Sequence, residues 1–145
     1  MFLGEYERSL DDKSRLALPS ELRARLGPGA VLTRSFDNCL CIYPAARWEA
    51  LARAVDDLPQ VRYEARVLAR SLFGGAVPCE FDRQGRMIIP AFLREHAGFT
   101  LHDDIVVVGL YSRIEIWSRE TWDGQRQKFE MQGSQLAEVL SLPRV

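Results

Sequence analysis

The chain contains an internal repeat, which constrains its fold more than any other feature of the sequence. Residues 10–27, LDDKSRLALPSELRARLG, align with residues 81–98, FDRQGRMIIPAFLREHAG, at a shift of 71 positions. A second match follows at a shift of 74, where residues 40–48, LCIYPAARW, align with residues 114–122, IEIWSRETW. Two copies of one unit in a chain of 145 residues predict a domain with internal twofold symmetry.

Each copy predicts four short strands and one short helix. A strand, a polar turn and a second strand make an expected hairpin. A proline then ends the second strand, because it has no N–H to donate, and a glycine closes the helix that follows. The expected strands are 4–10, 15–18, 30–34 and 39–43 in the first copy and 76–81, 86–89, 105–109 and 113–117 in the second, with helices at 20–26 and 91–97.

A unit of about 45 residues is too small to bury a stable core alone. We therefore expect each half to complete the sheet of the other, in one pseudo-twofold domain whose two polar turns project from the same end. The predicted class is mainly β with short helices. Further helices are expected between the copies and after them.

Composition excludes several kinds of protein. The chain is 47% hydrophobic and 27% charged, which is typical of a folded globular protein. No apolar run approaches the roughly 20 residues of a membrane span, and no secretory leader is recognisable, so we expect a cytoplasmic protein. The three cysteines and two histidines lack the spacing of a metal site, and we expect no cofactor. A net charge of −1 gives no overall attraction to DNA.

The turn of each copy has the pattern Asp-x-x-x-Arg, which allows three interpretations. Asp11 and Asp82 could be catalytic carboxylates, but no histidine, metal cluster or reactive cysteine accompanies them. Each turn could instead be a surface ion pair without a ligand. In the third interpretation, the aspartate shapes the turn while Arg15 or Arg86 offers a forked donor to phosphate or guanine. The residue types favour binding over catalysis.

Taken together, these motifs, with MFLGEY at the start and VLTRSFDNCLCIYPAARW in the first copy, resemble the MraZ family of bacterial transcriptional regulators. The resemblance implies two tandem swapped-hairpin modules of the SpoVT/AbrB type that together form a β-barrel. It also implies subunits assembled into a ring and binding of double-stranded DNA, without a small-molecule substrate. The DNA would be short direct repeats upstream of the division and cell-wall gene cluster, which the protein would repress. Related modules serve as antitoxins, so a protein-binding module is the alternative.

The family's signature falls on Asp11 with Arg15 and on Asp82 with Arg86, with a glycine expected before each arginine. Gly85 matches that glycine, whereas Ser14 departs from it and puts the first turn's conformation in question. The residues expected to contact DNA are Arg15, Arg86, Lys13, Arg83 and Arg8, and those expected to shape the turns are Asp11, Asp82, Ser14 and Gly85. Avidity within a ring would offset the low net charge.

We place the first module at residues 5–47 and the second at residues 76–119. A helical connector at 48–75 joins them, and a C-terminal helix and tail occupy 120–145.

Overall fold

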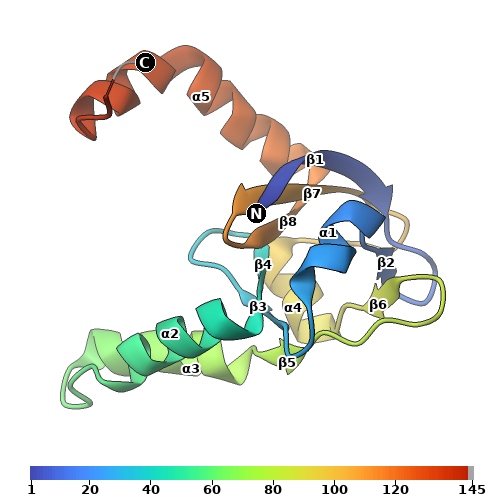
Figure 1. The fold of residues 1–145 in the computed structure, drawn as a ribbon, viewed down its shortest axis with the longest axis horizontal. Helices are drawn as coiled ribbons and strands as arrows, with labels where there is room; N and C mark the ends of the chain where they lie inside the picture. The colour runs from blue at the N-terminus through green and yellow to red at the C-terminus, as the bar shows by residue number, and fades with distance from the viewer. Residues whose placement is uncertain (144–145) are drawn as a thin grey trace.

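The structure, a computed structural model, describes residues 1–143 as a mixed β and α fold (Figure 1). In chain order the elements are β1 (Phe2–Ser9), β2 (Arg15–Ala17), α1 (Ser20–Leu26), β3 (Val31–Arg34), β4 (Leu40–Tyr43), α2 (Ala45–Asp56), α3 (Tyr63–Gly74), β5 (Val77–Pro78), β6 (Arg86–Ile88), α4 (Ala91–Ala97), β7 (Asp104–Tyr111), β8 (Ile114–Ser118) and α5 (Arg119–Val139). The two repeat helices begin and end at the expected residues.

The strands form a six-stranded antiparallel sheet in the order β1-β7-β8-β4-β3-β5 and a separate antiparallel pair, β2-β6. The repeat relates β1 to β5, β2 to β6, β3 to β7 and β4 to β8. Exchanging each strand for its equivalent reverses the strand order and leaves both arrangements otherwise unchanged. Cys41 lies opposite Glu115 at the centre of the β4–β8 ladder, and Leu16 lies opposite Met87 at the centre of β2–β6. Four of the pairings, β1–β7, β3–β5, β4–β8 and β2–β6, join one half to the other, so each half does complete the other's sheets.

Two expectations about pairing were wrong. The strands β1 and β2 do not form a hairpin, because β1 pairs with β7 and β2 with β6. The ladders within residues 1–143 also leave the larger sheet open, with β1 and β5 as its edges, so they do not close a barrel. The second-copy strand expected at 76–81 is reduced to Val77–Pro78, where Pro78 has no N–H to extend a ladder. The module boundaries given above stay a prediction.

The core lies between the six-stranded sheet on one side and the β2–β6 pair with α1 and α4 on the other. Equivalent residues of the two halves meet in it: Leu16 and Met87 are 0% and 2% exposed, and Leu22 and Leu93 are equally buried. Burial of these side chains is the main favourable contribution to folding. The β2–β6 pair is therefore held against the core by its inward-facing side chains.

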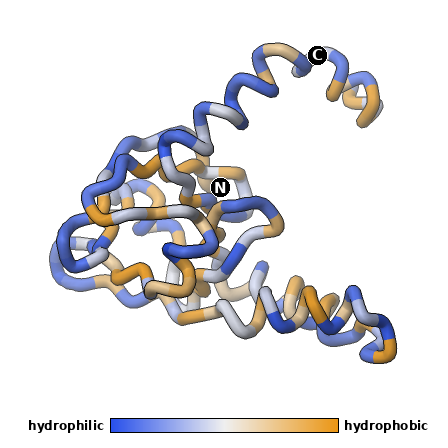
Figure 2. Tube along the Cα trace, turned by 180° about the vertical axis from the view of Figure 1, so that it is seen from behind, coloured by the Kyte–Doolittle hydropathy of each residue, from blue (hydrophilic) through white to orange (hydrophobic). Residues whose placement is uncertain are grey.

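The helical elements outside the repeats extend away from this body (Figure 1). Helices α2 and α3 form an antiparallel pair on one side. Helix α5 buries none of its residues, and at its base Trp122 Nε1 donates to the Glu5 carboxylate at 2.8 Å. Its outer part carries exposed apolar side chains, among them Phe129 and Val139. Figure 2 shows hydrophobic segments among the hydrophilic ones along this helix.

The close approach of β1 to β7 allows the pairing between the two halves to be tested. A Cβ added at Gly109 would overlap main-chain atoms of Phe2 and Leu3, so Gly109→Ala should displace β1 and lower the free energy of unfolding by about 1–3 kcal/mol or more. Gly124→Ala in α5 is the matched control, because nothing lies within 4 Å of its added Cβ. It should stabilise the protein by roughly 0.5–1 kcal/mol or leave it unchanged. Urea unfolding followed by tryptophan fluorescence measures both, and equal effects would contradict the packing described.

Candidate functional site

The first Asp-x-x-x-Arg turn is closed by its aspartate. Asp11 Oδ1 accepts hydrogen bonds from the backbone N–H groups of Lys13 and Arg15, both at 2.9 Å. Its Oδ2 accepts from Arg15 Nε at 2.7 Å. The backbone N–H of Ser14 donates to the Asp11 carbonyl at 3.0 Å. The carboxylate therefore fixes both the backbone of the turn and the direction of the arginine.

The second turn repeats this pattern atom for atom. Asp82 Oδ1 accepts from the backbone N–H groups of Gln84 and Arg86, at 2.9 and 3.0 Å. Its Oδ2 accepts from Arg86 Nε at 2.9 Å, and the backbone N–H of Gly85 donates to the Asp82 carbonyl at 3.0 Å. The shared geometry indicates that Asp-x-x-x-Arg is one structural unit used twice.

Each turn is completed by the other half of the chain. The Ser14 carbonyl accepts from the backbone N–H of Ile89 at 2.9 Å, and the Gly85 carbonyl accepts from that of Leu18 at 3.1 Å. Arg86 Nη1 also comes to 3.9 Å from Asp11 Oδ2. The two turns thus flank one short ladder and lie at the same end of the molecule, away from α2, α3 and α5 (Figure 1).

The arginines lie on the outer face of the β2–β6 pair, opposite the buried Leu16 and Met87. Side chains alternate between the two faces of a strand, so Arg15 and Arg86 share the outer face. Their side chains are 24% and 29% exposed. Within residues 1–143 the guanidinium of each arginine donates to its aspartate through Nε, and its terminal nitrogens donate no hydrogen bond to protein. These terminal nitrogens can donate to a bound acceptor.

Hydrogen bonding keeps both aspartates ionised. The pKa of Asp11 is lowered from 3.8, mainly by the backbone N–H of Arg15, with the Arg15 guanidinium adding to the effect. The pKa of Asp82 is lowered in the same way by Arg86. A carboxylate with a lowered pKa holds no proton to donate near neutral pH, which suits a turn-shaping role better than acid catalysis.

The remaining predicted cations differ in their positions. Lys13 and Arg83 are exposed on their respective turns. Arg8 lies on β1, where its Nη1 donates to the Glu7 carbonyl at 2.7 Å and its guanidinium lies 6.0 Å from the centre of the Tyr6 ring. The structure therefore brings Arg15 and Arg86 together between Lys13 and Arg83, whereas Arg8 makes none of the contacts that form the turns.

Ser14 adopts the conformation expected of glycine. Its φ is 60°, close to the 76° of Gly85, so the first turn has the same left-handed residue despite the side chain. Such a conformation is unfavourable for a residue with a Cβ. Gly85 also leaves room for a neighbour, because a Cβ there would overlap the guanidinium of Arg23.

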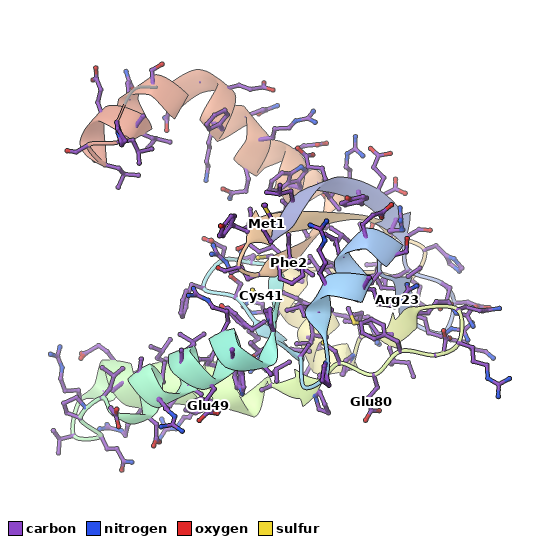
Figure 3. All side chains as sticks on the ribbon, viewed as in Figure 1. Met1, Phe2, Arg23, Cys41, Glu49 and Glu80 are labelled. Atoms are coloured by element: carbon purple, nitrogen blue, oxygen red, sulfur yellow. The ribbon has the colours of Figure 1, made fainter. Side chains whose placement is uncertain are left out.

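Two arginines for which the sequence predicted no role contact the backbone just after β2 and β6. Arg23 Nη1 donates to the Leu18 carbonyl at 2.9 Å, and Arg94 Nη1 makes the equivalent bond to the Ile89 carbonyl. Arg23 lies beside the β2–β6 pair (Figure 3). These bonds join each repeat helix to the end of its strand. The signal in the sequence was the recurrence of arginine at the same position in both copies, four residues after the proline.

Two kinds of feature are absent from residues 1–143, the part of the chain that the structure describes. No group of three or more His, Cys, Asp and Glu side chains there could hold a metal ion. No helix there is long and apolar enough to cross a membrane.

Comparison with known proteins shows that both halves of the chain match the same family. The family described as "MraZ protein, putative antitoxin-like" matches residues 1–71 and, a second time, residues 72–141. The chain is 46% identical to the transcriptional regulator MraZ of Roseiflexus castenholzii over 141 residues, which cover 97% of each protein. It is 44% identical over 140 residues to the proteins of the same name from Heliobacterium modesticaldum and Moorella thermoacetica, covering 97% of this chain and 96% of each relative.

Exchanging the left-handed residues of the two turns tests their local geometry. Ser14→Gly should stabilise the protein by up to about 1 kcal/mol, because relief of the strained conformation exceeds the entropy that glycine adds to the unfolded chain. Gly85→Ser should destabilise it by about 1–3 kcal/mol, since it adds both strain and a clash with Arg23. Thermal unfolding measures both variants. Effects of the same sign would contradict the equivalence of the turns.

Proposed function

The chain belongs to the MraZ family, and on that premise we propose that it is a sequence-specific DNA-binding regulator of transcription. The observation that carries the proposal is the placement of Arg15 and Arg86 on one outer face by two equivalent turns. Each arginine is oriented through Nε and keeps its terminal nitrogens for a ligand. Two preoriented forks on a narrow two-stranded ribbon suit the acceptors of guanine in the major groove of DNA.

The other residues of the site have supporting roles in this proposal. Lys13 and Arg83, exposed at the two sides of the ribbon, would attract the phosphates that border the groove. Arg8 would add phosphate attraction from β1. Asp11 and Asp82 would not touch DNA, because their oxygens are used in forming the turns.

Assembly of several copies would offset the low charge of the chain. A ring of subunits that each present one such face to successive DNA repeats would bind far more tightly than one subunit. The exposed apolar side chains of α5, including Phe129, Met131 and Val139 at 71%, 82% and 79% exposure, are available for contacts between subunits.

The resemblance to the family suggests the target of binding. The DNA would be direct repeats upstream of the division and cell-wall gene cluster, and the protein would repress that cluster, including its own gene. It would therefore act in the cytoplasm, associated with the nucleoid.

The alternative, an antitoxin-like or other protein-binding module, has less support. It would need a segment that wraps a partner, and the C-terminal candidate is instead a helix, α5. Co-purification of a toxin-like protein with the chain would favour the alternative.

Substitution of each turn arginine tests the proposal. Arg15→Ala and Arg86→Ala should each weaken binding to DNA from upstream of the gene by about 1–3 kcal/mol per site, because each removes a charge-assisted donor. Arg53→Ala in α2 is the matched control, since Arg53 is an exposed arginine whose guanidinium pairs with Glu49. A gel-shift series compares the four proteins. Binding by Arg15→Ala as tight as that of the parent would refute the assignment of the first turn.

Salt dependence separates phosphate contact from other modes of binding. Although the chain has a net charge of −1, the logarithm of the binding constant should fall steeply and linearly with the logarithm of salt concentration, because each neutralised phosphate releases counterions. Fluorescence anisotropy at a series of salt concentrations measures the slope. Replacement of Lys13 by Ala should reduce its magnitude, and an affinity insensitive to salt would rule out the mechanism.

A further inference from the structure

The outer face of the β2–β6 pair holds four side chains, and they form two unequal pairs. Arg15 lies opposite Ile88, and Ala17 lies opposite Arg86. The repeat relates Arg15 to Arg86 and Ala17 to Ile88. The symmetric backbone therefore presents an arginine beside an isoleucine on one side and an arginine beside an alanine on the other.

The larger of the two aliphatic side chains is unusually open to solvent. Ile88 is 66% exposed, whereas its two neighbours in the chain are packed: Met87 is 2% exposed and Ile89 is fully buried. Exposure of an isoleucine on this small face, directly across the ladder from a cation, contributes nothing evident to the stability of the chain. Covering it by a ligand would remove apolar surface from water.

The turns that flank the face are unequal as well. Residues 11–15 hold two acidic and two basic side chains, whereas residues 82–86 hold one acidic and two basic. The difference arises because Arg83 occupies the position of Asp12 and Gln84 occupies that of Lys13. Because β2 and β6 are antiparallel, the first turn lies at the Ile88 end of the face, and the more positive turn lies at the Ala17 end.

We propose that Ile88 determines part of the DNA sequence preference by packing against the C5-methyl group of a thymine in the major groove. This inference rests on the proposed function and names a reading residue for the same face. The thymine methyl is the one apolar group that a base pair displays in that groove, and aliphatic side chains recognise it. Because Ala17 reaches less far than Ile88, the two sides of the face read different bases, and the protein binds a non-palindromic site in one orientation.

Selection from a random duplex library tests which positions Ile88 reads. The wild-type protein, Ile88→Ala and the exchange variant Ala17→Ile with Ile88→Ala are each used to enrich duplexes, which are then sequenced. We expect the wild type to enrich an asymmetric site with a thymine at one fixed position. Ile88→Ala should lose the preference at that position alone, and the exchange variant should show it at the position related by the twofold axis.

Replacing thymine by deoxyuracil tests the methyl contact itself. On the selected duplex, deoxyuracil at the fixed position should weaken wild-type binding about fourfold, which corresponds to one buried methyl group, and should not affect Ile88→Ala. Ile88→Val, which keeps a branched side chain, should remain sensitive. Circular dichroism and thermal unfolding of each variant verify that the fold is kept, as expected for a side chain this exposed.

Two results would overturn the inference. One is an unchanged sequence preference in Ile88→Ala, including the case in which the variant only changes the mass of the oligomer, which would assign Ile88 to contact with a second copy. The other is equal sensitivity of wild type and Ile88→Ala to deoxyuracil. Failure of the proposed function is distinguishable from both, because Arg15→Ala and Arg86→Ala would then bind the selected duplex as tightly as the wild type.

Discussion

The pairing of β2 with β6 is the interaction on which the rest of the structure depends. Neither turn is complete in its own half, because the Ser14 and Gly85 carbonyls accept hydrogen bonds from the N–H groups of Ile89 and Leu18 across the ladder. Inward, the same ladder buries Leu16 against Met87 in the core. Outward, it presents both turn arginines. One short ladder therefore joins the halves, completes the core and builds the candidate site.

In each turn the aspartate does not occupy all the donors of the arginine beside it. An arginine that paired fully with an aspartate would have little to offer a ligand. Here each aspartate uses one oxygen for backbone N–H groups and the other for Nε, and the fork of the guanidinium remains at the surface. Arg23 and Arg94 then link the repeat helices to the strand ends. A low net charge is thus compatible with a local basic face.

Much of this arrangement was predictable from the repeat, and the parts that were not have physical reasons. The helices at 20–26 and 91–97 were bounded correctly because proline and glycine mark their ends locally. The partners of β1, β2, β5 and β6 were not, since an alternating pattern shows which face of a strand is buried but not which strand lies beside it. The open edge at Pro78 and the contacts of Arg23 with Leu18 and Gly85 depend on three-dimensional packing. Ser14 shows that a left-handed turn position does not require glycine when the surrounding bonds impose it.

The proposed function requires Arg15 and Arg86 to act together from one face on the major groove of DNA. Methylation of guanine N7 removes the acceptor that such arginines would use, so an interference experiment with partially methylated promoter DNA tests it directly. Methylation at two nearby guanines should block binding of the wild-type protein. Arg15→Ala should become insensitive to methylation at one of them and Arg86→Ala at the other. Binding that tolerates N7 methylation throughout the site would contradict the proposed function.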